Sequence, residues 1–291
     1  MDIARQLIDD GFCVLEDMLD VAALQQTRDV SMEAVLALSK ESLDGARAPG
    51  TLIDSGKVPG LADCIGNPMA MAALEAMGFR DIGFYTAVVI SKPPGGPRLY
   101  GHQDCMMWDD PRAYSDFSPM IFHMYYLDDT NRENGCLRLI PGSHRKWHEL
   151  HEAGTAHTAD MKRAEDMDDP RFGDYLGEVD VPINAGDLLI GASRLFHSTH
   201  ANTSDKHRTV ITIWFHPSFH DLQETTQSWV YHEFHTLHDA WPADALKKIS
   251  AMIPDYHGSA EPMELNRQPD RAKMTNRNEA YRPGEPRSAF L

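Results

Sequence analysis

The chain has 291 residues, and its 42% hydrophobic and 24% charged residues are ordinary for a globular protein. Its net charge of −17 argues against a nucleic-acid or anionic-membrane partner, because phosphate contacts need clustered Lys and Arg. No apolar run approaches the roughly 20 residues that a membrane-spanning helix needs.

The first 80 residues predict helices around one short strand. Helices are predicted over 2–9, 20–40 and 67–78, and a strand over 12–15. The third helix has the clearest boundaries, with Asn67 as its N-cap, Pro68 in its first turn and Gly78 at its end. We therefore expect this region to support a core formed by later residues.

From Ile82 onward the sequence changes to short β-rich runs. These runs are IGFYTAVVIS (82–91), MIFHMYYL (120–127), GCLRLIPG (135–142), GEVDVPI (177–183), DLLIGAS (187–193) and RTVITIWFH (208–216). Turn signals such as Asn134-Gly135 and Pro141-Gly142 separate them. Many short strands with regular turns favour a jelly-roll or barrel, so we predict a mainly β fold with flanking helices.

The other segments lack a strand pattern. Residues 148–177 are highly charged and read as a surface insertion that is partly helical, whereas 222–241 and 242–253 read as helices. The tail from about Glu261 is rich in Pro, Arg and Asn and is expected to be irregular. We expect a single catalytic domain over 1–291, with helical support in 1–80, the β core in 81–220, and C-terminal helices and a tail in 221–291.

The most informative motif is His102-Gln103-Asp104, followed much later by His197. On a strand, a histidine and a carboxylate two residues apart point to the same face, because side chains alternate with period two. Two imidazoles and one carboxylate on one side of a metal leave the other positions open, which is typical of oxygen-activating non-haem Fe(II) sites. The motif therefore predicts an iron centre.

Arg208 follows His197 after a turn rich in Ser, Asn and Asp, so the returning strand could place a cation beside the metal. Arg208, Val210, Thr212 and Trp214 share one face of that strand by alternation. If this face lines a barrel interior, the guanidinium needs an anionic partner. A guanidinium can hold the distal carboxylate of a dicarboxylic cosubstrate with two parallel hydrogen bonds.

These motifs resemble the phytanoyl-CoA dioxygenase family of Fe(II)/2-oxoglutarate oxygenases. The resemblance rests on HQD (102–104), ENGCLRLIPGSHR (133–145), INAGDLLIG (183–191) and HSTHANTSDKHR (197–208), with SKPPGG (91–96) and Asp10-Gly11-Phe12 as weaker matches. It implies a double-stranded β-helix, a cupin-like jelly-roll core. It also implies Fe(II), 2-oxoglutarate and O2, with ascorbate as a candidate reductant.

The resemblance assigns roles to individual residues. His102, Asp104 and His197 are the expected metal ligands, and His197 is favoured over His200 and His207 because its distance to Arg208 fits the family pattern. Arg208 is expected to bind 2-oxoglutarate. Thr199 and Gln103 are further candidates for cosubstrate contacts, although Thr199 could equally be a turn hydroxyl and Gln103 points away from its neighbours on an ideal strand.

Four residues are candidates for the substrate pocket. Met106, Met107 and Trp108 directly follow the metal motif, but core packing explains them equally well. Met124 falls where some family members have an aromatic residue that contacts the cosubstrate, so the chain departs from the family there. We also expect a mobile cover over the site, for which 148–177 and the C-terminal tail are candidates.

The predicted function is hydroxylation of an unactivated C–H bond of a small-molecule substrate, with succinate and CO2 as co-products. Asp104 favours hydroxylation over halogenation, because related halogenases have a small residue there. Desaturation, epoxidation and ring closure remain alternatives, as do a cupin-like metal-dependent hydrolase or isomerase and a binding protein without turnover.

The cysteines bear on location. Cys13, Cys64, Cys105 and Cys136 are dispersed without a CxxC pair, and no basic-then-apolar leader begins the sequence. We therefore expect reduced thiols in a cytoplasmic protein. The sequence indicates neither the substrate nor the oligomeric state.

Overall fold

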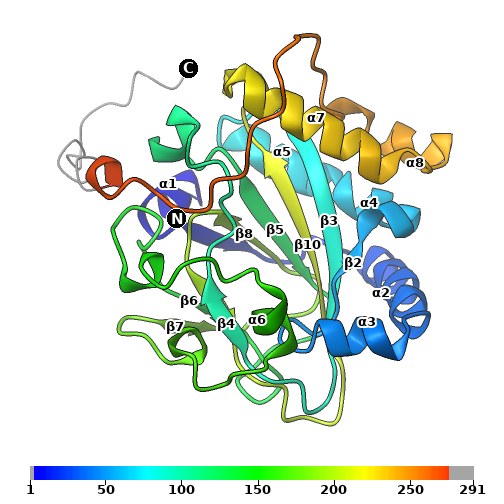
Figure 1. Cartoon of the computed structure of the whole chain (residues 1–291). Coiled ribbons are helices and arrows are strands. Elements are labelled where there is room, and N and C mark those ends of the chain that lie inside the picture. The colour runs from blue at the N-terminus through cyan, green and yellow to red at the C-terminus, as the bar shows by residue number, and fades with distance from the viewer. Residues whose placement is uncertain (1–2, 275–291) are drawn as a thin grey trace.

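The computed structural model describes residues 3–274, and its strands form two antiparallel sheets. The larger sheet has the order β1-β8-β5-β10-β3-β2 and the smaller sheet the order β4-β9-β6-β7 (Figure 1). The strands are β1 (Phe12–Leu15), β2 (Ile53–Asp54), β3 (Gly83–Lys92), β4 (Leu99–His102), β5 (Ile121–Tyr126), β6 (Leu137–Leu139), β7 (Val179–Val181), β8 (Leu188–Ala192), β9 (His197–Thr199) and β10 (Arg208–His216).

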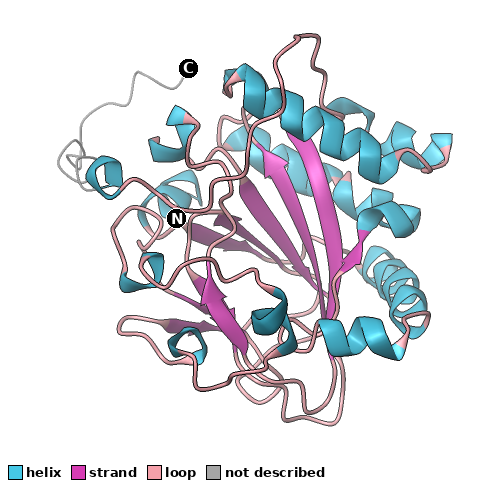
Figure 2. Ribbon diagram, in the orientation of Figure 1, coloured by secondary structure: helices cyan, strands magenta, loops and turns pink. Residues whose placement is uncertain are grey.

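The helices come mainly from the two ends of the chain. Figure 2 shows them in cyan beside the magenta strands. They are α1 (Ile3–Asp9), α2 (Val21–Leu36), α3 (Lys40–Gly45), α4 (Ala62–Ile65), α5 (Pro68–Ala76), α6 (Ala159–Arg163), α7 (Glu224–His238) and α8 (Ala243–Lys248). The two sheets form a jelly-roll core and the helices flank it, as the sequence predicts. None of the helices in residues 3–274 combines the length and the apolar character required to cross a membrane.

Side-chain alternation along β10 explains the position of the core. Ile211, Ile213 and Phe215 point to one side, into a large apolar cluster that includes residues of α2, α5, α7 and α8. Val210 and Trp214 point to the other side, toward the smaller sheet. The helices thus cover the outer face of the larger sheet, and its inner face lines the space between the sheets (Figure 1).

The helix boundaries depend on local capping. Asn67 accepts hydrogen bonds from the backbone N–H groups of Met69 and Ala70, so α5 begins as predicted. The helix predicted over 20–40 ends earlier, because α2 stops at Leu36. A second helix, α3, begins at Lys40, where the Ser39 hydroxyl caps it. The part of the predicted irregular tail from 275 onward, and residues 1–2, lie outside the described residues.

The predicted insertion over 148–177 contains α6 and two 3-10 helices, η4 (Glu149–His151) and η5 (Pro170–Phe172), but no strand. Its side chains pack against β4 in a small cluster of Tyr100, Met161 and Phe172. The insertion therefore lies beside the open end of the space between the sheets.

Candidate metal centre

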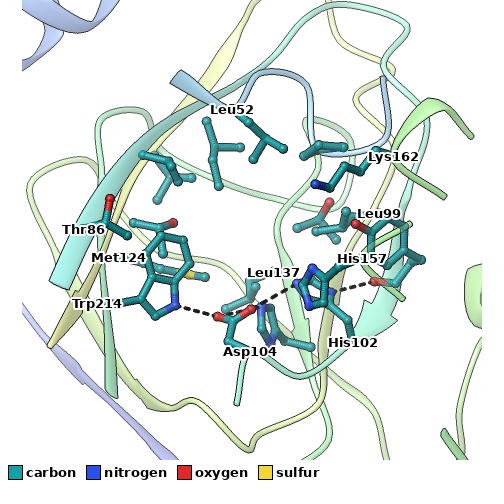
Figure 3. A pocket seen from close by; sticks show the side chains of 18 of the residues that line it. Leu52, Thr86, Leu99, His102, Asp104, Met124, Leu137, His157, Lys162 and Trp214 are labelled. Carbon is teal, nitrogen blue, oxygen red and sulfur yellow. Dashed lines mark hydrogen bonds and ion pairs between the residues drawn. The ribbon is translucent and has the colours of Figure 1, made fainter. Parts of the chain in front are cut away.

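A cavity of about 310 Å³ lies between the two sheets (Figure 3). Its lining includes seven of the ten predicted site residues: His102, Asp104, Met106, Met124, His197, Thr199 and Arg208. The cavity-facing residues of β10, namely Arg208, Val210, Thr212 and Trp214, all contribute, as their alternation predicts. The predicted site residues from distant parts of the sequence thus meet around one enclosed space.

His102, Asp104 and His197, hereafter the triad, form a compact buried group. His102 at the end of β4 pairs with His197 at the start of β9, and the two ring centroids are 4.2 Å apart. Asp104 lies between the rings, with Oδ1 3.6 Å from Nε2 of His102 and Oδ2 4.0 Å from Nε2 of His197. Both Nε2 atoms therefore lie within 4.0 Å of the same carboxylate group, an arrangement that fits a facial metal site.

The reason for this convergence differs from the predicted one. We expected His102 and Asp104 on one strand, but β4 ends at His102 and Asp104 lies in the loop that follows. The backbone N–H groups of Asp104 and Cys105 both donate to the carbonyl of Ser193, at 2.7 and 2.9 Å. This loop-to-loop contact, rather than a sheet ladder, holds the carboxylate beside the imidazoles.

Hydrogen bonds orient all three side chains. Nδ1 of His102 is 3.0 Å from the carbonyl of Tyr100, and Nδ1 of His197 is 3.0 Å from the carbonyl of Leu195. Each Nδ1 must donate in these contacts, which leaves Nε2 of each ring unprotonated and directed at the centre. The Trp214 indole donates its N–H to Oδ2 of Asp104 at 2.9 Å.

The electrostatics favour the protonation states of His102 and Asp104 that a metal requires. Burial lowers the pKa of His102 well below its usual value, and His197 lowers it further. Burial raises the pKa of Asp104, but the nearby imidazoles and the Trp214 hydrogen bond outweigh this effect and leave its pKa lowered. Neutral imidazole and ionised carboxylate are the forms that bind a metal ion.

Arg208 lines another part of the cavity wall, and a second buried cation, Lys92, lies beside it. Arg208 on β10 pairs in register with Lys92 on β3, and both side chains are buried. Burial lowers the pKa of both groups, and the charge of Arg208 lowers that of Lys92 further. Within residues 3–274, Nε of Arg208 has no hydrogen-bond partner and no carboxylate forms an ion pair with the side chain. An anionic ligand would supply the missing counter-charge.

Thr199 lies beside this cationic end. Its hydroxyl accepts a hydrogen bond from Nζ of Lys92 at 2.8 Å, and the same ammonium donates to the carbonyls of Pro97 and His200. Lys92 thus fixes the Thr199 hydroxyl at the cavity wall. The sequence motif SKPPGG contained Lys92, but its role depends on a strand pairing that no local pattern indicates.

Three predicted residues do not reach the cavity. The Gln103 amide donates to the carbonyl of Arg267 at 2.9 Å, because Gln103 points away from its two neighbours. Met107 and Trp108 are almost fully buried in a separate apolar cluster with Phe219 and Val230. Gln103 therefore points away from the cavity, and Met107 and Trp108 pack in the core.

The competing histidines also lie elsewhere. His200 is 2.6 Å from a carboxylate oxygen of Asp180 and lies with Asp180 and Cys136 in a second potential ligand group, in which Asp180 is exposed. His207 is 3.0 Å from the hydroxyl of Ser91. Neither lines the cavity.

The cavity residues that sequence reasoning missed include three basic or imidazole side chains: His157 and Lys162 from the insertion, and Arg267 from the C-terminal segment. The His157 and His102 ring centroids are 5.1 Å apart, and His157 joins His102 and Asp104 in a group whose potential ligand atoms all lie within 4.8 Å of one another. Both proposed cover segments thus supply lining residues, although no periodic pattern marked these positions.

Comparison with known proteins gives a consistent result. The model of the phytanoyl-CoA dioxygenase (PhyH) family matches residues 8–210. Uncharacterized protein Rv1501 of Mycobacterium tuberculosis is 28% identical over 233 residues, which are 73% of this chain and 74% of that protein. Dioxygenase lolE1 of Epichloe uncinata is 25% identical over 56% of this chain and 58% of its own length.

Among solved structures, the non-haem α-ketoglutarate-dependent epimerase SnoN from nogalamycin biosynthesis has the same fold. Its TM-score is 0.57 at 18% sequence identity, over 74% of this chain and 81% of SnoN. The family match covers well over half of the chain and includes all three triad residues. The chain belongs to the phytanoyl-CoA dioxygenase (PhyH) family.

Proposed function

We propose that this chain is a dioxygenase that hydroxylates an unactivated C–H bond of a small-molecule substrate. In the overall reaction, substrate, O2 and 2-oxoglutarate give the alcohol, succinate and CO2. One observation carries the proposal: the triad and the Arg208 guanidinium, which lacks an anionic partner among the described residues, face the same buried cavity.

The triad is proposed to hold Fe(II) through Nε2 of His102, a carboxylate oxygen of Asp104 and Nε2 of His197. Their protonation states fit this role without any proton transfer, because both Nε2 atoms are free to coordinate and the carboxylate is ionised. The Trp214 hydrogen bond leaves Oδ1 of Asp104 without a competing donor and fixes the rotation of the carboxylate.

Arg208 is proposed to bind the distal carboxylate of 2-oxoglutarate, and Thr199 to donate its hydroxyl to the same group. The Thr199 hydroxyl can donate outward because it accepts from Lys92. When bound, iron and 2-oxoglutarate would supply the electrons that activate O2, a capacity that side chains lack. The protein's own contribution is to bind, to orient and to exclude water from an enclosed apolar space.

The accompanying inferences are a single catalytic domain and a cytoplasmic location. The cavity supports the first, since Leu52 near the N-terminus, β10 and the C-terminal Arg267 all line it. The second is supported by the four cysteines, which are free and buried. Ascorbate belongs to the proposal as the added reductant.

The test is an anaerobic titration of the metal-free protein with Fe(II) and then 2-oxoglutarate. We expect a weak visible charge-transfer band that requires both additions, followed by succinate formation when O2 and ascorbate are admitted. A hydrolase or isomerase that uses the triad for Zn(II) or Mn(II) would show no such band and no dependence on 2-oxoglutarate. With substrate, hydroxylation adds one atom of oxygen from labelled O2, whereas desaturation and ring closure remove two hydrogens instead.

A further inference from the structure

Two cationic side chains, Lys162 and Arg267, line the cavity beyond the triad. Lys162 extends from α6 of the insertion into the cavity near Leu99 (Figure 3). Both line the cavity together with His157, whose ring packs against that of His102, so both lie near the metal centre. These cations are separate from Arg208, which the proposed cosubstrate occupies.

The position of Arg267 is fixed by backbone pairing. Its neighbour Asn266 forms a bridge with Met107, and the backbone N–H of Asn266 donates to the carbonyl of Met106 at 2.9 Å. The Gln103 amide holds the carbonyl of Arg267, whose guanidinium lies 3.4 Å from the carbonyl of Asp104. Residues just before and after Asp104 therefore hold Arg267 at the cavity.

Within residues 3–274 neither cation has an acidic partner, although the full sequence carries a net charge of −17. Across residues 3–274 no carboxylate forms an ion pair with Lys162 or Arg267, and both side chains are half-buried. Nearby basic residues differ: Arg163 pairs with Asp160 and Glu165, and Arg271 pairs with Glu152. Arg171 of the insertion pairs with Asp169, and Lys273 of the C-terminal segment lies over the ring of Tyr114, whereas Lys162 and Arg267 are directed at the cavity.

The charges of the lining residues indicate the sign and the magnitude of the charge that a ligand would carry. The two acidic residues of the lining are Asp104, assigned to the metal, and Asp54. Asp54 is already engaged, because its Oδ1 accepts from the backbone N–H of Gly56 and its Oδ2 is 3.4 Å from the Thr86 hydroxyl. The two positive charges of Lys162 and Arg267 and the one negative charge of Asp54 sum to one net positive charge. A ligand with a single negative charge would balance it.

Part of the wall is apolar. Leu52, Val88, Ile90 and Leu99 line the same cavity, and Figure 3 shows Leu52 and Leu99 on the side where Lys162 enters. Such a wall contributes binding energy in proportion to the apolar surface that it covers. A ligand that matches the site has an apolar body and one charged end.

We propose that the substrate is a small monocarboxylic acid with an apolar body, whose carboxylate is held by Lys162 and Arg267 while the body lies against the apolar wall. This assignment rests on the proposed function for the reaction itself. Because the two cations come from the insertion and from the C-terminal segment, the acid would join these two segments over the site.

The test compares octanoate with its uncharged analogue octanamide, by anaerobic calorimetry on the full chain loaded with Fe(II) and saturating 2-oxoglutarate. We expect octanoate to bind at least about tenfold more tightly, as loss of a charged hydrogen-bonding partner predicts. Lys162→Gln and Arg267→Gln should each remove most of this preference. The matched controls Arg163→Gln and Arg271→Gln, on the same two segments, should keep it.

Equal affinity for acid and amide, no binding of either, or a preference that survives in the Lys162→Gln/Arg267→Gln double variant would overturn the proposal. Repeating the titration on the metal-free chain without 2-oxoglutarate separates it from the proposed function. If the metal-free chain prefers octanoate to octanamide and Arg267→Gln removes that preference, the substrate proposal is supported even if iron and 2-oxoglutarate do not bind. A preference that is lost only in Arg208→Gln places the acid at the wrong end of the cavity and also overturns it.

Discussion

The indole N–H of Trp214 on β10 donates to Oδ2 of Asp104, at 2.9 Å, from the opposite sheet. This bond links the strand that carries Arg208 to the loop that carries the triad carboxylate. It leaves one carboxylate oxygen for a metal and fixes the direction in which that oxygen points. Positioning of this kind is worth about 10- to 100-fold in metal affinity.

Trp214→Phe should therefore weaken Fe(II) binding by about tenfold or more while the fold is retained. Competition with a coloured chelator measures the affinity, and circular dichroism checks the fold. Trp147→Phe is the matched control, because the indole of Trp147 bonds to Glu152 at the surface. Equal iron affinity in Trp214→Phe and the wild type would show that the hydrogen bond does not position the ligand.

His102→Ala and Asp104→Ala should each abolish stoichiometric Fe(II) binding and 2-oxoglutarate turnover. Thermal unfolding should change little in the metal-free state, because both side chains face a cavity rather than the packed core. His200 lies next to β9 and its ring pairs with Asp180. His200→Ala should therefore retain full iron binding. Iron binding that survives in His102→Ala but is lost in His200→Ala would place the metal at the Cys136 group instead.

Arg208→Leu should have opposite effects on cosubstrate binding and on stability. The dissociation constant of 2-oxoglutarate should rise by at least about thirtyfold, because a desolvated carboxylate loses its partner. The metal-free chain should not lose stability and should gain about 1 kcal/mol, since an uncompensated buried charge is removed.

The contrast for this prediction is Arg138→Leu, which breaks a buried ion pair with Glu178. That change should lower the free energy of unfolding by about 3 kcal/mol, because it leaves the carboxylate without its partner. Urea unfolding measures both variants. Destabilisation of Arg208→Leu to the same degree as Arg138→Leu would mean that Arg208 has a structural partner rather than a ligand.

Stability should also fall in mild acid because of His123 on β5. This histidine is fully buried, and neither ring nitrogen has a partner among the described residues. Burial lowers the pKa of His123 to about 3, whereas an unfolded chain has a value of about 6.5. Between these values only the unfolded chain takes up the proton, so the free energy of unfolding falls by about 1.4 kcal/mol per pH unit as the pH decreases.

His123→Leu should accordingly reduce the stability lost between pH 7 and pH 5 by roughly 2 kcal/mol, as measured by urea unfolding at both values. The exposed His232→Leu is the control and should leave the loss unchanged. An identical pH dependence in His123→Leu and the wild type would contradict the assigned cause.

The sequence predicts those features that depend on local patterns. Alternation along 208–216 correctly places Arg208 and Trp214 on the cavity side, and the Asn67 cap correctly begins α5. Asp104 was correctly placed near His102, but for the wrong reason, because a contact with the Ser193 carbonyl replaces the expected strand. Lys162 and Arg267 could not be predicted, since their segments have no periodic pattern and reach the cavity only through tertiary contacts.

The most direct test of the metal centre is an anomalous diffraction measurement at the iron edge, on crystals grown anaerobically with Fe(II) and 2-oxoglutarate. We expect one iron peak within bonding distance of His102, Asp104 and His197, with 2-oxoglutarate extending from it to Arg208. An iron peak beside Cys136, Asp180 and His200, or a cosubstrate that does not contact Arg208, would contradict the account.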